Sequence, residues 1–126
     1  MILLDHLAIT SGNKQNALSF YRDFLYFEER YTFSIPENVS ETFFPGKTIK
    51  EILVLEKENL KLEIFIIEGK EPIPAIQHFC ITHTNFDQII KQAPARGVPV
   101  LKVFHKDHDV YFIKDSDGNM IEIKPG

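Results

Sequence analysis

Two histidines and two glutamates occupy matching places in two similar stretches of the chain. An early stretch, DHLAIT, aligns without a gap with a later one, QHFCIT, so that His78 falls 72 positions after His6. Glu63 and Glu122 each stand between two aliphatic residues, in the tripeptides LEI and IEI. A carboxylate in an apolar strand is costly unless a charge, a hydrogen bond or a metal ion compensates it. The four residues are therefore candidates for one functional site.

The alternation of apolar and polar residues predicts that the four side chains lie on one face of a β-sheet. Successive side chains of a strand point to opposite faces. The aliphatic neighbours of each glutamate are therefore expected to pack against a core, while the glutamate points away from it. The same alternation places His6 and His78 on the face of the glutamates. Pairing two such halves about a pseudo-twofold axis brings two imidazoles and two carboxylates together.

This ligand set suits Zn²⁺, Ni²⁺, Fe²⁺, Mn²⁺ or Co²⁺. A six-coordinate ion held by His6, Glu63, His78 and Glu122 keeps two positions for water or substrate, where it can polarise a carbonyl or activate a water. Each residue taken alone also fits a structural role, because satisfied core histidines and solvated strand glutamates are common. The repetition of the pair in both halves favours the metal site.

The elements that position these residues are predicted to follow one order twice: strand, helix, three strands. This order predicts an α+β domain over residues 1–126, with module one at 1–69, a linker at 70–74 and module two at 75–126. Helices with one apolar stripe each are expected at 14–27 and 85–93. The expected strands cover 2–10, 28–33, 49–56, 60–68, 76–82, 98–104, 110–114 and 120–124, with loops at 34–48 and 105–108 and a turn at 115–119.

The chain resembles the vicinal oxygen chelate superfamily, which includes glyoxalases, bleomycin-resistance proteins and dioxygenases. The most specific segment, DSDGNMIE, ends at Glu122 and is similar to a family motif in which Asp-Pro-Asp-Gly-Asn precedes Ile-Glu. Ser116 replaces the usual proline, and Tyr26 stands where the family usually has glycine. The resemblance covers nearly the whole chain and is carried by residues 5–9, 17–25, 62–64, 77–79 and 111–122.

This resemblance implies two βαβββ modules that form a cupped mixed sheet around a metal. It also implies a homodimer, in which the modules pair either within one chain or between two. The His/Glu/His/Glu set is similar to that of glyoxalase I, the lactoylglutathione lyase, where a glutamate moves a proton between adjacent carbons through an enediolate. Carried over, His6, Glu63, His78 and Glu122 are the metal ligands. Either Glu122 or Glu63 is the catalytic base, with a slight preference for Glu122.

The expected function is a metal-dependent lyase or isomerase of the glyoxalase I type, acting on a small α-oxygenated or thiol-conjugated substrate. One alternative is a fosfomycin-resistance-type thiol transferase, which uses two histidines and one glutamate. Another is a ring-cleaving dioxygenase, which keeps an open position for O₂. A fourth donor at Glu63 argues against both. A non-catalytic small-molecule binding protein of the bleomycin-resistance kind is a further alternative, although such proteins usually lack the four ligands.

Four further residues are candidates for substrate binding. Cys80 shares the face of the second histidine, although a lone thiol in an apolar strand is more often a small core residue. His105 and His108 lie three positions apart in a predicted loop, where solvation is the simpler interpretation. Tyr111 begins the segment that leads to the second glutamate.

Two phenylalanines, Phe43 and Phe44, stand beside Pro45 in the loop predicted at 34–48. They could form a lid over a ligand. Packing against the body of the domain or against a second subunit is an equally good interpretation of the same pair.

The bulk composition argues for a small-molecule partner. A formal net charge of −4 argues against nucleic acid and anionic membranes, which both favour a basic surface. The single cysteine excludes an internal disulfide and favours a reducing compartment. No apolar run is long enough for a membrane span, and the N-terminus reaches Asp5 too early for a signal peptide. The expected location is the cytoplasm.

Overall fold

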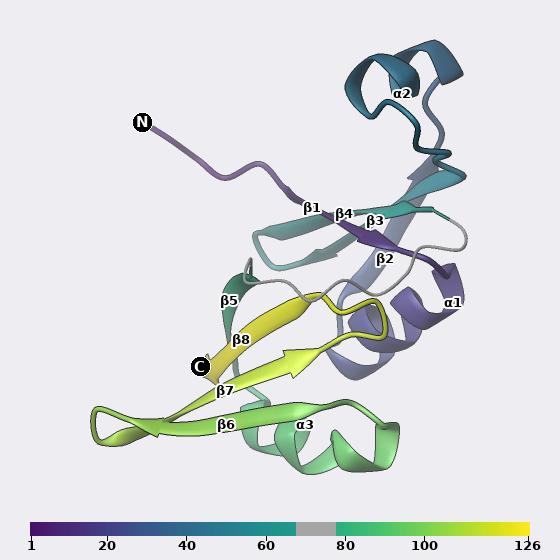
Figure 1. The fold of residues 1–126 in the computed structure, drawn as a ribbon. Helices are drawn as coiled ribbons and strands as arrows, with labels where there is room; N and C mark the ends of the chain where they lie inside the picture. The colour runs from purple at the N-terminus through teal and green to yellow at the C-terminus, as the bar shows by residue number, and fades with distance from the viewer. Residues whose placement is uncertain (68–77) are drawn as a thin grey trace. The chain divides into compact units, whose positions relative to one another are not determined.

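The structure, a computed structural model, describes residues 1–67 and 78–126. The chain divides into two compact units, Met1–Glu71 and Pro72–Gly126 (Figure 1). The predicted linker 70–74 lies outside the described residues, as do the predicted module ends at 69 and 75, the end of the strand at 60–68 and the start of the strand at 76–82. No helix in the described ranges is long and apolar enough to cross a membrane.

Unit 1 contains a four-stranded mixed sheet in the order β1-β4-β3-β2. β1 is parallel to β4, and the other neighbouring strands are antiparallel. Along β4 the side chains at 62, 64 and 66 are buried, while those at 61, 63 and 65 are partly exposed. The elements are β1 (Leu7–Ser11), α1 (Lys14–Ala17), η1 (Leu18–Phe24), β2 (Glu28–Phe33), α2 (Glu37–Phe43), β3 (Glu51–Lys57) and β4 (Leu60–Ile66).

Unit 2 contains a second four-stranded sheet with the equivalent order, β5-β8-β7-β6. Again the first strand is parallel to the last, and the other pairs are antiparallel. The helix α3 packs on β8 and buries Phe86 and Ile89. The predicted α+β class with two βαβββ modules is therefore confirmed. The elements are β5 (His78–His83), α3 (Phe86–Gln92), η2 (Pro94–Arg96), β6 (Val100–His105), β7 (His108–Lys114) and β8 (Met120–Pro125).

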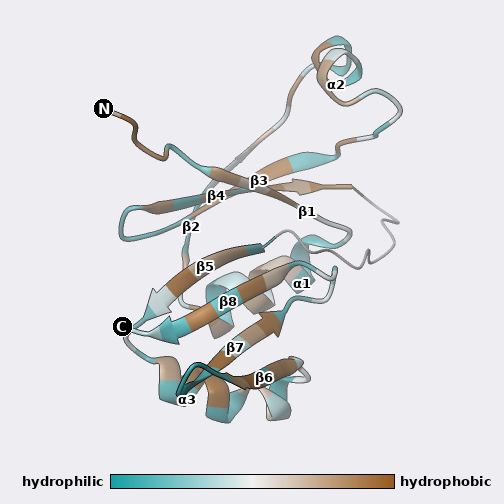
Figure 2. Cartoon of the chain, turned by 60° about the vertical axis from the view of Figure 1, so that its left-hand side comes forward, coloured by the Kyte–Doolittle hydropathy of each residue, from teal (hydrophilic) through white to brown (hydrophobic). Residues whose placement is uncertain are grey.

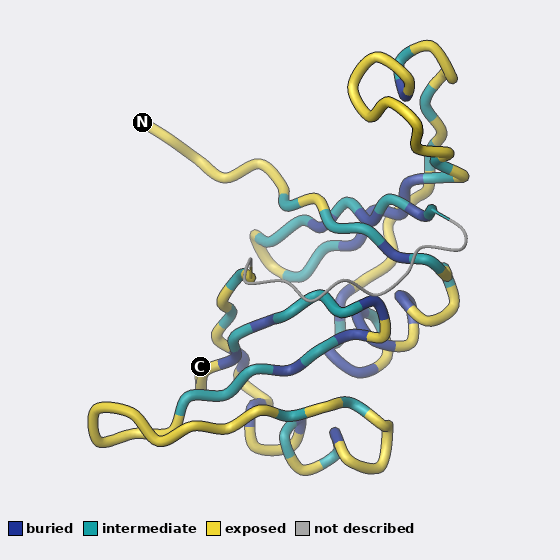
Figure 3. The backbone as a smooth tube through the Cα atoms, viewed as in Figure 1, coloured by how far each residue is buried: buried dark blue, intermediate teal, exposed yellow. Residues whose placement is uncertain are grey.

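The first strand is shorter than predicted, because it begins at Leu7 and not at Ile2. Leu7 pairs with Leu62, and β4 itself begins only two residues earlier. The residues at the N-terminus therefore extend past the start of their partner strand. Met1 to Leu4 are hydrophobic and exposed, as Figures 2 and 3 show.

The loop predicted at 34–48 is wrong in part, because it contains the helix α2. Pro36 is the N-cap residue of this helix. Proline is tolerated there because the first N–H groups of a helix have no intrahelical acceptor. Most residues of α2 are exposed, as Figure 3 shows.

The helix predicted at 14–27 begins as an α-helix and continues as a π-helix over Leu18–Phe24. The Asn13 side chain caps its start by accepting a hydrogen bond from the Asn16 N–H at 3.0 Å. After the helix, Tyr26 has a φ of +67°, in the left-handed region. This conformation explains why glycine is usual at that position of the family.

The polar loop predicted at 105–108 is instead a two-residue hairpin turn. His105 and His108 are the last pair of the β6–β7 ladder. Lys106 and Asp107 form the turn with φ values of +50° and +69°. Positive φ at both central residues matches the right-handed twist of hairpin strands, so the two histidines belong to strands.

Candidate metal-binding site

In unit 1, His6 and Glu63 lie close together. Glu63 stands opposite Ala8 in the parallel β1–β4 ladder, and His6 directly precedes β1. The His6 Nε2 lies 3.5 Å from the Glu63 Oε1. The other ring nitrogen, Nδ1, lies 2.7 Å from the Asp5 Oδ2. A carboxylate on the second imidazole nitrogen is common among metal-binding histidines, because it fixes the ring and its tautomer.

Sequence reasoning missed Asp5 as a partner of this pair. Its hydrogen bond with His6, and then the charge of Lys61, hold the pKa of the Asp5 carboxyl below its ordinary value. The carboxylate is therefore negative at neutral pH and favours an imidazole whose Nδ1 carries the proton. That tautomer leaves Nε2, the atom facing Glu63, as a lone-pair donor. The adjacency of Asp5 and His6 was the signal available in the sequence.

In unit 2, His78 and Glu122 form an equivalent pair. Glu122 stands opposite Cys80 in the parallel β5–β8 ladder, as Glu63 stands opposite Ala8. The His78 Nε2 lies 3.5 Å from the Glu122 Oε1, the same distance between the same atoms as in unit 1. The predicted repeat is therefore present in the register and side-chain geometry of both units.

The geometry of each pair fits a divalent ion. Two donor atoms bound at about 2.1 Å to one ion lie roughly 3.0–3.4 Å apart, depending on whether the angle is octahedral or tetrahedral. Each pair is therefore close to the spacing that metal binding requires. Within the described residues, however, no three or more histidine, cysteine, aspartate or glutamate side chains gather as a metal site. The four-ligand set thus remains a prediction, of which each unit holds half.

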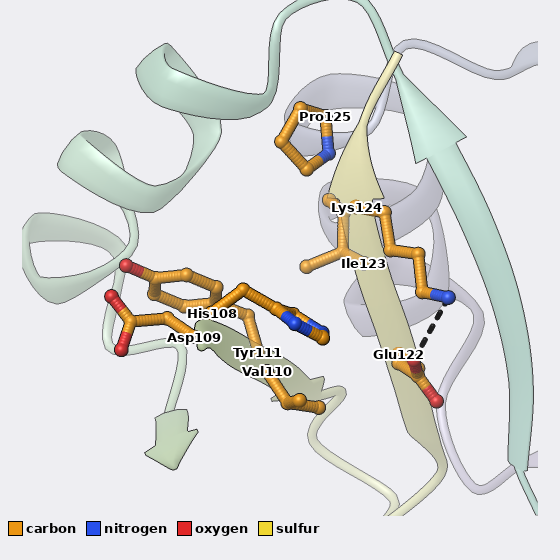
Figure 4. Close-up of a pocket in the computed structure, with 8 residues that line it drawn as sticks. All are labelled: His108, Asp109, Val110, Tyr111, Glu122, Ile123, Lys124 and Pro125. Atoms are coloured by element: carbon orange, nitrogen blue, oxygen red, sulfur yellow. Dashed lines mark ion pairs between the residues drawn. The ribbon is translucent and has the colours of Figure 1, made fainter. Parts of the chain in front are cut away.

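Glu122 also lines a pocket of about 270 Å³ in unit 2 (Figure 4). Two of the predicted substrate-binding residues, His108 and Tyr111, line it too. Figure 4 shows His108 directed toward the strand that carries Glu122. Lys124, which sequence reasoning did not single out, lines the pocket and places its Nζ 3.7 Å from the Glu122 Oε2. The lining includes two carboxylates, of Asp109 and Glu122, an amine, an imidazole and a phenol. The phenol ring of Tyr111 packs on Phe86 of α3, on the opposite face of the sheet from Glu122.

The other two predicted substrate-binding residues do not line this pocket. His105 is exposed at the end of β6. Cys80 is exposed at the surface of its strand. Partial burial, and then the charge of Glu122, raise the pKa of the Cys80 thiol. A raised pKa keeps the thiol protonated and makes it a poor nucleophile at neutral pH.

Unit 1 carries a second hollow, an apolar groove of about 300 Å³. One wall is Phe44, whose ring meets that of Phe65 edge to face at 5.4 Å between centroids. Phe65 is two residues after Glu63 on β4, so the groove and the His–Glu pair share one face of the sheet. The groove is lined by Ala8, Ile9, Thr10, Phe44, Lys47, Ile49, Phe65 and Ile67.

Residues 3–123 match the model of the Glyoxalase/Bleomycin resistance protein/Dioxygenase superfamily, and the chain belongs to this superfamily. No curated protein matches the chain. Among solved structures, it is similar to a glyoxalase family protein from Enterococcus faecalis, with 23% identity, a TM-score of 0.69 and coverage of 96% of this chain and 95% of that one.

Two solved structures of the fosfomycin resistance protein FosX are also similar to the chain. One, from Listeria monocytogenes, is a mutant complexed with Mn(II) and 1S,2S-dihydroxypropylphosphonic acid; it has 16% identity, a TM-score of 0.74 and coverage of 100% and 92%. The other, from Mesorhizobium loti, has 14% identity, a TM-score of 0.70 and coverage of 100% and 94%. At these sequence identities, the similarity shows only that this chain and the solved structures share a fold.

Proposed function

We propose that this chain is a divalent-metal-dependent lyase or isomerase of the glyoxalase type. Its substrate would be a small molecule with oxygens on adjacent carbons, either α-oxygenated or conjugated to a thiol. One observation carries the proposal: both units bring a histidine Nε2 to 3.5 Å from a glutamate Oε1 at equivalent register positions. Two independent structural glutamates would have no reason to repeat this geometry.

His6, Glu63, His78 and Glu122 would hold the ion, which we expect to be Zn²⁺, Ni²⁺, Fe²⁺, Mn²⁺ or Co²⁺. When bound, such an ion makes a C–H group beside a carbonyl more acidic. Glu122 would accept that proton on a carboxylate oxygen and return it to the adjacent carbon. We favour Glu122 over Glu63 because Glu122 lines a pocket with His108 and Lys124, where a substrate has room beside the carboxylate.

The proposal requires two half-sites to meet, either within one domain of residues 1–126 or across a homodimer. Mixing two single-site variants, His6→Ala and His78→Ala, distinguishes the two arrangements. If the half-sites meet between chains, a mixed dimer contains one intact set of four ligands, and metal binding returns. If they meet within one chain, every site lacks a histidine, and metal binding stays lost. The readout is metal content after gel filtration.

The proposed function is tested by metal analysis together with an activity assay. Purified protein, reconstituted with each of the five ions, is expected to bind about one ion per set of four ligands. The loaded protein is then assayed on the hemithioacetal of methylglyoxal. Protein that binds no divalent ion after reconstitution would overturn the proposal, while binding without turnover would reject this substrate and retain the metal site.

A fosfomycin-resistance activity is the second candidate, supported by the likeness to two FosX structures. The same loaded protein can be assayed on fosfomycin with and without an added thiol. Consumption of fosfomycin, with unchanged activity after Glu63→Gln, would favour this candidate, because the fosfomycin enzymes of the thiol-transferase kind need only one glutamate ligand.

A further inference from the structure

We infer that the groove between the unit 1 sheet and the segment that follows α2 is a binding site for an elongated, amphiphilic acid. Its apolar part, a short aliphatic chain or a single aromatic ring, would lie against the Phe44 and Phe65 rings, which contact each other, and its acid group would meet Lys47. The inference deepens the proposed function, on which it rests for the direction of the ligand toward Glu63. The groove itself can be tested without any metal.

The shape of the groove follows from how the segment after α2 is anchored. The N–H of Lys50 donates to the carbonyl of Ile66 at 2.9 Å, which holds the segment after α2 at the C-terminal end of β4. The ring of Phe44 then contacts the ring of Phe65 on β4. The groove therefore runs along β4, on the same face as Glu63.

The lining selects an apolar ligand part with a negative end. Six of the eight lining residues are aliphatic or aromatic, and Lys47 alone among the eight is ionisable. Lys47 is exposed, and its amine forms no ion pair within the described part of the chain. Because its charge has no partner there, a ligand acid group can take that place without displacing one.

The position of the groove excludes the smallest substrates. Glu63 does not line the groove, and the nearest lining residue on β4, Phe65, stands two positions later, roughly 7 Å along the strand. A ligand with two oxygens near the His6–Glu63 pair and an acid group near Lys47 must cross this distance and then continue into the groove. A three-carbon compound cannot do so, whereas a phenyl or hexyl chain with a terminal acid can.

The comparison of the two units supports a role in recognition. Unit 2 has only the turn residues Lys106 and Asp107 where unit 1 inserts the segment with α2, yet its His–Glu pair has the same geometry. The α2 segment is therefore not needed to build the pair. Phe44 keeps 41% of its surface exposed, as expected for a wall of an open groove and not for a core residue.

The experiment titrates metal-free, full-length protein with 4-phenylbutanoate and, separately, with the uncharged 4-phenylbutan-1-ol, followed by methyl NMR. The acid is expected to shift methyl signals of groove residues, above all Ile49, Ile67 and Thr10. The alcohol should bind about two- to fivefold more weakly, since an exposed charge pair contributes that much.

Two variants and two matched controls complete the test. Phe44→Ala removes the groove wall and should weaken binding of the acid about tenfold, while Phe43→Ala, its more exposed neighbour outside the groove, should not. Lys47→Gln should reduce the affinity for the acid to that for the alcohol, while Lys57→Gln should leave it unchanged. The lysine variants keep the test decisive if Phe44→Ala unfolds.

Equal affinity of all variants, or methyl shifts at Leu101 and Val103 of the exposed strand β6 in place of the groove, would overturn the inference. These results are independent of the metal. Groove binding without metal binding would leave the inference standing and reject the proposed function, and metal binding without groove binding would do the reverse.

Discussion

The two units reach the same His–Glu pair with different lengths of chain. In unit 1, Glu63 follows His6 by 57 positions, whereas in unit 2, Glu122 follows His78 by 44 positions. The register opposite each glutamate and the distance of 3.5 Å are nevertheless equal. The shared parts are the parallel pair of strands, β1–β4 and β5–β8. The parallel strand pair is therefore enough to bring each histidine to its glutamate. The connecting segments can differ between the units without changing this geometry.

The surroundings of the two glutamates differ. Two residues along the strand from Glu63 stands Phe65, which lines the apolar groove. Two residues along from Glu122 stands Lys124, which pairs with it at 3.7 Å and lines the polar pocket. The two units therefore have the same His–Glu geometry, where a metal would bind. They differ in the residues beside each glutamate, where a substrate would bind.

Replacing each glutamate in turn by glutamine tests whether Glu122 and Glu63 differ in function. Glu122→Gln is expected to lower kcat about 10²- to 10⁴-fold at saturating metal, because the proposed base is lost. Glu63→Gln should weaken metal binding but lower kcat less than tenfold once the metal saturates. Steady-state kinetics on the hemithioacetal of methylglyoxal measure both. If Glu63→Gln has the larger effect, the roles are reversed.

The turns that precede the two glutamate strands should differ in their contribution to stability. The buried Asp115 accepts hydrogen bonds through Oδ1 from the N–H groups of Asp117 and Asn119, at 2.9 and 2.8 Å. Asp115→Ala leaves these donors unsatisfied and should cost about 3 kcal/mol of unfolding free energy. Asn59→Ala, in the exposed β3–β4 turn, should cost less than about 0.5 kcal/mol. Urea denaturation compares them, and equal losses would contradict the expectation.

The Asp5–His6 contact is expected to raise the metal affinity of His6. Asp5→Asn should weaken metal binding about tenfold, since a carboxylate on a ligand histidine orients the ring and raises its basicity. Asp107→Asn, in the exposed β6–β7 turn, is the matched control and should leave the metal affinity unchanged. Competition with a chromophoric chelator measures both affinities. Identical affinities of Asp5→Asn and the parent protein would remove Asp5 from the site.

The smallest expected effect concerns Tyr26, at the end of the unit 1 helix. Tyr26→Gly should be more stable than Tyr26→Ala by about 1 kcal/mol, because alanine keeps the strain of a φ of +67° and glycine does not. Both variants lose the same ring contacts. The difference between their unfolding free energies therefore reports the backbone conformation alone. Thermal unfolding of the two variants gives the comparison, and a more stable alanine variant would refute it.

Much of the fold could be predicted from local patterns. Period-two alternation correctly placed Glu63 and Glu122 on strands with buried aliphatic neighbours, and the repeat correctly paired each glutamate with its histidine. The wrong predictions concern segments whose local sequence is compatible with two structures. Pro36 is as compatible with a helix start as with a loop, and the two residues between His105 and His108 are as compatible with a hairpin as with a loop.

The amino-acid sequence alone determined the family, the α+β class and the chemical character of the two pairs, because residue type and strand periodicity are local properties. Only the tertiary structure decided that the pairs share one distance and one register, since parallel strands such as β1 and β4 are joined through a long connection. Tertiary structure also created the groove. Phe44 and Phe65 are 21 positions apart, and their rings meet because the segment after α2 is held to β4 by the hydrogen bond from Lys50 to Ile66.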